Sequence, residues 1–165
     1  MSTLSVDTIQ GQTTAANVKL PAGTPVQVVS QSTTTQTNIS STSFTATGLS
    51  QTITPKYASS KILILVNMSA DFFQQGNSSK SLGLQILRDS TAITTRGDNC
   101  YAGVATNGYY SVPIHGTISF LDSPSTTNSI TYSVKGNVSS TSNSTTLRMG
   151  NSNATSTLTL MEIAQ

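Results

Sequence analysis

The chain has 165 residues, a formal net charge of +2 and only 8% charged side chains, where an ordinary globular domain has about 25%. Hydrophobic residues make up 35%, and serine and threonine together fill about a third of the positions. The length suits one domain with a real core. The low net charge excludes disorder driven by self-repulsion, and the scattered basic residues exclude the clustered positive face that nucleic-acid binding requires.

The chain opens with an isolated short strand, predicted over residues 2–9. Leu4, Val6 and Ile9 are its apolar residues, and the hinge that begins at Gly11 separates it from everything that follows. A lone strand is unstable in water. We therefore expect residues 1–24 to be an N-terminal arm that anchors the protein or exchanges a strand, by adding to a sheet edge elsewhere.

Alternation of apolar and polar residues with a period of two continues along the chain, and no 3.6-residue stripe is present. After the opening strand it predicts strands at 17–20, 25–30, 43–47, 49–54, 61–70, 81–88, 91–95, 109–114, 117–121, 129–138, 145–149 and 155–163. Turn sequences such as Pro21-Ala-Gly and Asp122-Ser-Pro-Ser separate these strands. Many short strands at a spacing of about 8–12 residues are typical of an antiparallel sandwich or barrel. We predict an all-β fold: an antiparallel, jelly-roll-like sandwich over residues 25–165, preceded by the N-terminal β arm.

The strand predicted at 61–70 is apolar on both faces. One face carries Ile62, Ile64, Val66 and Met68, and the other carries Leu63 and Leu65. The outer face of a one-sided antiparallel sheet should be polar. Two explanations remain open: a central strand covered by a loop of its own chain, or a subunit interface at which a neighbouring copy covers Leu63 and Leu65.

Groups for catalysis are few. His115 is the only histidine and Cys100 the only cysteine. No nucleophile-elbow sequence or converging pair of acids is present, and His115 with Cys100 has no recognisable metal-ligand spacing. We expect no catalytic site, no cofactor and no metal. His115 is interpreted as capping a turn before Gly116, and Arg96-Gly97-Asp98 as part of a solvated loop.

Features of targeting are also missing from the sequence. No charged and apolar leader opens the chain, so we expect no secretory signal. The longest apolar run, at 62–66, is too short to span a bilayer, so we expect no membrane insertion. Synthesis in a cytoplasm without disulfides is the expectation.

Several stretches resemble small virion structural proteins of tailed phages, particularly those of cyanobacteria and marine bacteria. They are the opening "STLSVDTIQGQT" and "VKLPAG", the later "TGLSQTITPKYASSKILILV", "GLQILRDSTAI" and "SFLDSPSTTNSITYSVKG", and the ending "STLTLMEIAQ". Together they span most of the chain, and none is a catalytic motif. The resemblance implies an all-β, commonly homotrimeric protein of the virion surface, made in the host cytoplasm and released by lysis.

Within that class, a capsid decoration or cement protein is favoured, with the major capsid protein or another virion protein as its partner. A tail or head fibre that contacts a host surface glycan or receptor is the alternative, and an enzyme such as a depolymerase is a third. Only about 24 residues precede the domain and no shaft-like repeat is present, which favours decoration over a fibre.

Overall fold

The computed structural model describes residues 20–75, 80–102 and 108–165, with every side chain there except those of residues 96–102 and Tyr110. These residues form ten strands and two short 3₁₀ turns: β1 (Pro25–Thr33), β2 (Thr37–Ile39), β3 (Thr45–Ile53), β4 (Lys61–Gln75), β5 (Lys80–Arg88), β6 (Thr91–Ala102), β7 (Tyr109–Asp122), β8 (Ile130–Val138), η2 (Ser142–Ser144), β9 (Thr146–Met149), η3 (Asn151–Asn153) and β10 (Ser156–Ile163). Within this described part, no helix has the length and apolar character needed to cross a membrane.

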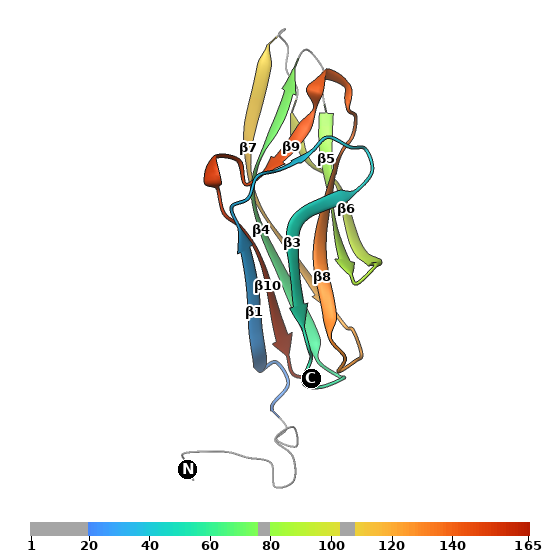
Figure 1. The fold of residues 1–165 in the computed structure, drawn as a ribbon. Helices are drawn as coiled ribbons and strands as arrows, with labels where there is room; N and C mark the ends of the chain where they lie inside the picture. Colours follow the sequence, from blue (N-terminus) through green and yellow to red (C-terminus); the bar gives the residue numbers. More distant parts are fainter. Residues whose placement is uncertain (1–19, 76–79, 103–107) are drawn as a thin grey trace.

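The strands form two antiparallel sheets that pack face to face (Figure 1). Sheet A has the order β1-β10-β4-β9-β2, with β7 on the second edge of β4, and sheet B has the order β3-β8-β5-β6. Strand β4 is the spine of sheet A. One of its edges pairs first with β10 and then with β9, and the other edge pairs with β7 along nearly its whole length.

The pairing confirms the predicted all-β antiparallel sandwich. Strands pair from the outside of the sequence inward: β1 with β10, β3 with β8, β4 with β7, and β5 with β6. This nested pairing over two sheets is the arrangement of a jelly roll. It brings β1 and the C-terminal strand β10 side by side (Figure 1).

The core lies between the sheets and follows the alternation of the sequence. Ile62, Ile64 and Val66 are fully buried, as is Tyr132 from the facing sheet. Met68 is nearly so, which confirms the predicted core face of β4. Among the described residues, every buried member of the core cluster lies between Ile39 and Leu160.

Two inward carboxylates link separate parts of the sandwich. Asp122, at the end of β7, accepts hydrogen bonds from Arg88 at 3.0 Å and from the Tyr132 hydroxyl at 2.7 Å. Burial, and then the hydrogen bond to Asp122, raise the pKa of Tyr132 above its ordinary value. This cluster ties β7 of sheet A to β5 and β8 of sheet B.

Glu162 is the second inward carboxylate and is fully buried. It accepts hydrogen bonds from the backbone N–H groups of Lys56 and Tyr57, at 2.7 and 3.2 Å, and from the Gln27 amide at 2.6 Å. A buried charge with three donors meets the requirement that buried charges be hydrogen-bonded. The loop after β3 is thereby held against β10.

Some predicted boundaries are wrong. Residues 109–114 and 117–121 belong to one strand, β7, so His115 lies in mid-strand and does not cap a turn before Gly116. Likewise 43–47 and 49–54 merge into β3, across a register shift at Gly48. The loop expected around Arg96 lies within β6, which runs to Ala102. The short strand β2 was not predicted.

Candidate functional site

A row of four apolar side chains crosses the outer face of sheet A. The register pairs Val28 with Met161, Met161 with Leu63, and Leu63 with Leu121, on β1, β10, β4 and β7. Directly paired residues of an antiparallel sheet point to the same face. Val28 and Leu121, at the two ends of this apolar row, are 53% and 47% exposed.

The structure places the predicted interface residues Leu63 and Leu65 on this outer face. Both are half-buried, whereas Ile62 and Ile64 between and beside them are fully buried on the opposite face. Leu63 is the centre of the apolar row, and Leu65 lies one step further along β4. Both leucines therefore share one surface, and whether a neighbouring copy covers them stays a prediction.

Hydroxyl-bearing side chains border the apolar row. The next row along the strands consists of Ser30, Thr159, Leu65 and Ser119, and the one after it of Ser32, Thr157, Asn67 and Thr117. Ser30 and Thr159 hydrogen-bond each other at 2.9 Å across β1 and β10. An apolar strip with a neutral polar border is the usual composition of a protein–protein interface.

At the other end of β4, the same face carries an ion pair beside two stacked aromatic rings. Arg148 of β9 donates from Nε to both oxygens of Asp71, at 3.2 and 3.0 Å, and from Nη2 to Asp71 and to Ser111. The Arg148 guanidinium lies 4.6 Å from the ring centre of Phe73, which stacks on Tyr109 at 5.8 Å. Tyr109 itself is 75% exposed.

His115 lies between these two regions, with Nδ1 at 3.2 Å from the Ser69 hydroxyl. A cavity of about 230 Å³ beside it is lined also by Asp71, Ser111 and the loop at Asn151. The Asp71 carboxylate is bound to Arg148 and Ser111, with no bond to His115 among the described groups, so serine, histidine and acid do not form a triad here. Over the described residues, no group of three metal-ligating side chains gathers either.

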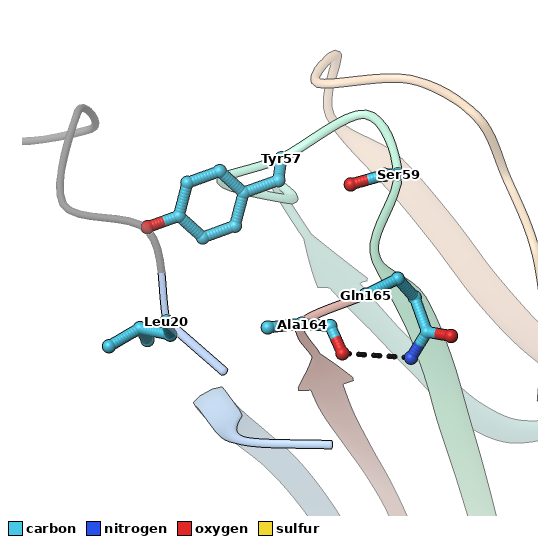
Figure 2. A pocket seen from close by; sticks show the side chains of 5 residues that line it. All are labelled: Leu20, Tyr57, Ser59, Ala164 and Gln165. Atoms are coloured by element: carbon cyan, nitrogen blue, oxygen red, sulfur yellow. Dashed lines mark hydrogen bonds between the residues drawn. The ribbon is translucent and has the colours of Figure 1, made fainter. Parts of the chain in front are cut away.

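A second cavity, of about 180 Å³, lies where the chain enters the domain. Leu20, Tyr57, Ser59, Ala164 and Gln165 line it, as Figure 2 shows. Backbone hydrogen bonds join Gly23 and Thr24 to Ala164, at 2.8 and 2.9 Å. These bonds hold residues 23 and 24 against the residue that follows β10.

The predicted arm residues Leu4, Val6 and Ile9 lie outside the described residues. The apolar row was only half predicted, through Leu63. Val28, Met161 and Leu121 each stand next to an apolar residue that faces the core, so each breaks the alternation locally, but only the register between strands brings them into line. The doubled apolar pairs are a local signal for each residue, and a long-range pairing pattern would have shown that they form one row.

Comparisons with known proteins give a limited likeness to solved structures. No family model matches the chain, and no curated protein matches it. One of the solved structures similar to it is titled "Structure of infectious bursal disease virus Gt strain", at 16% sequence identity and a TM-score of 0.36. The match covers 87% of this chain and 39% of that one, so this chain spans about two fifths of the length of its structural neighbour.

Proposed function

We propose that this chain is a structural protein of a virion surface, a capsid decoration or cement protein that assembles as a homotrimer through the outer face of sheet A. The observation that carries the proposal is the apolar row through Val28, Leu63 and Leu121, which crosses four strands and remains half exposed at both ends. An exposed apolar patch bordered by polar residues marks an interaction surface.

Energetics favour covering this row. Full burial of a valine or leucine contributes about 1.5–3 kcal/mol, so burying the exposed halves of Val28 and Leu121 contributes roughly 1 kcal/mol each. The contact is repeated at every subunit boundary of a closed ring. Because the surface holds few charges, ion pairs contribute little, and assembly should persist over a wide range of salt.

The virion assignment and the threefold number are supported by the resemblance to virion proteins of tailed phages. The partner is then the major capsid protein or another virion protein, and the N-terminal arm contacts either that partner or a sister chain of the trimer. Both the arm attachment and the apolar row lie at one end of the sandwich, since Leu63 is near the start of β4, whose first residue Lys61 pairs with Ile163. One end of each subunit would thus carry both contacts.

A tail or head fibre is the second candidate, and one observation favours it. Tyr109 pairs with Gln75 at the last residue of β4, the end of the sandwich away from Ala164. An aromatic ring that is 75% exposed, backed by Phe73 and next to an Arg–Asp pair, suits contact with a host glycan or receptor. A fibre would point this end outward.

The oligomer is tested by sedimentation equilibrium of the intact chain at micromolar concentration. The proposal predicts a species of three times 17.2 kDa, little changed between low and high salt. A folded, stable monomer would overturn it. Gold-labelled antibody on intact particles then separates decoration from fibre: label over the capsid shell supports the first, and label confined to fibres supports the second.

A further inference from the structure

Strand β7 leaves one long edge of sheet A without a partner among the described residues. The direction in which the N–H and C=O groups of β7 point follows from the pairing of His115 with Ser69 of β4. The Ser69 N–H donates to Ser156 and its carbonyl accepts from Gly150, so both groups point away from β7. His115, as the partner in a non-hydrogen-bonded pair, directs its own N–H and C=O to the free edge.

Every second residue of β7, counted from His115, directs its backbone groups the same way. Thr117, Ser119 and Leu121 present their backbone groups to the free edge, and so does Pro113, which has no N–H to offer. Proline on the outward positions of an edge strand is one device that blocks further pairing. It protects the first half of β7, but the stretch after His115 has no proline and no Lys, Arg, Asp or Glu before Asp122.

The opposite side of the sandwich is closed by side chains. Gln27 of β1 donates to the Thr54 carbonyl at 2.7 Å, and Gln31 donates to Gly48 and accepts from the Ser50 N–H at 3.2 Å. These bonds join the β1 edge of sheet A to the β3 edge of sheet B. A further strand would have to displace them.

Other sheet edges carry devices that limit pairing. The register of β3 shifts between Ala46 and Ser50, which interrupts its ladder. Strand β6 has Arg96 and Asp98 in its sequence, and β2 is three residues long. The second half of β7 is therefore the long edge that the described fold leaves open to a partner strand.

A cavity of about 260 Å³ opens beside this same stretch. Its lining includes Met68 and Leu84 from the core, together with residues 114–119 of β7. The inward side chains Ile114 and Ile118 are only partly buried, although they pack on the core. An added strand with apolar residues on its inner face would complete their burial.

We propose that residues 2–9 of a neighbouring copy add to the second half of β7 as a further strand of sheet A. This inference deepens the proposed function and rests on it. Leu4 and Val6 fall on one face of an extended segment and match the apolar cavity, and Asp7 is the only charge. Residues 10–19 can span about 33 Å when extended, enough for the segment to leave its own domain.

Hydrogen exchange on the intact, full-length protein tests the proposal. We expect every second amide of residues 3–10, those whose N–H groups face β7, to exchange at least about tenfold more slowly than in the free peptide of residues 1–12. Thr117→Pro removes an N–H that faces only the free edge, so it should return these amides to the peptide rate. Thr117→Ala keeps the N–H and is the matched control. The double variant Leu4→Asp/Val6→Asp, which alters no described residue, should also lose protection.

A mixed assembly distinguishes a neighbour's edge from the chain's own. One chain carries Thr117→Pro with an intact arm, and the other carries Leu4→Asp/Val6→Asp with an intact edge. Co-assembly should restore slow exchange to the intact arm, whose peptide is identified by its mass. Fast exchange in the mixture, or in the unaltered protein, would overturn the proposal. If the unaltered protein is a trimer with fast-exchanging arms, this inference alone fails; if it is a monomer, the proposed function fails with it.

Discussion

Replacing Leu63 by aspartate tests the assembly surface at its centre. Leu63 lies between Met161 and Leu121 in the apolar row, and its side chain is half-buried in the single subunit. An aspartate there can still turn its carboxylate toward water in the monomer, so the fold should survive. Under a neighbouring subunit, the same carboxylate is desolvated without a partner, which costs several kcal/mol or raises its pKa.

The size of this penalty determines how the effect on assembly can be measured. A penalty of about 3 kcal/mol weakens association roughly a hundredfold, because each 1.4 kcal/mol is a factor of ten. Light scattering across a dilution series, with circular dichroism to check the fold, should show a folded Leu63→Asp chain that dissociates at much higher concentration than the unaltered protein. Leu65→Asp should act in the same direction.

Asn67→Asp is the matched control, since it adds the same charge on the same strand and face, two rows from the apolar row. It should leave assembly almost unchanged. A folded Leu63→Asp chain that is still fully trimeric would refute the reasoning. An unfolded chain would show that Leu63 supports the core of the single subunit.

Three further predictions concern stability and are measured by urea denaturation. Tyr132→Phe should cost about 1–3 kcal/mol at neutral pH by removing a hydrogen bond to the buried Asp122 carboxylate. The raised pKa keeps Tyr132 protonated in the fold while the unfolded chain ionises above about pH 10, so the stability of the unaltered protein should fall above that pH. If stability falls as steeply with pH in Tyr132→Phe, Tyr132 is not the cause. Glu162→Ala should cost about 2 kcal/mol or more by leaving the backbone N–H groups of Lys56 and Tyr57 unbonded. Glu162→Gln should cost less, since its amide oxygen can still accept one of these hydrogen bonds. Equal losses of stability in the two variants would contradict this role of the side-chain oxygen. Gly150→Ala should destabilise by at least about 1 kcal/mol more than Gly23→Ala: both have positive φ, but only at Gly150 would a Cβ meet a backbone carbonyl, at 2.7 Å.

The fold class was predictable because alternation with a period of two is a local property of the sequence. It identified nearly every strand and assigned Ile62, Ile64 and Val66 to the core face of β4. It also identified Leu63 as out of place on the outer face. That Val28 and Leu121 lie in the same row as Leu63 was not predictable, since only pairings between distant strands align them.

Local turn signals failed where the sheet overrides them. The His115-Gly116 pair suggested a break, yet β7 continues through it because β4 offers a paired partner to both residues and a Cβ at Gly116 would meet nothing within 4 Å. Gly48 interrupts β3 with a register shift and does not end the strand. In each case tertiary pairing decides, and propensity gives only a weak prior.

A cryo-EM reconstruction of the intact virion, at a resolution that traces this chain, tests the central claim most directly. We expect three copies around each threefold contact on the capsid shell, with Val28, Leu63 and Leu121 of each copy covered by its neighbour. A chain that occurs in the virion with this row facing solvent, or that is absent from the particle, would contradict the account.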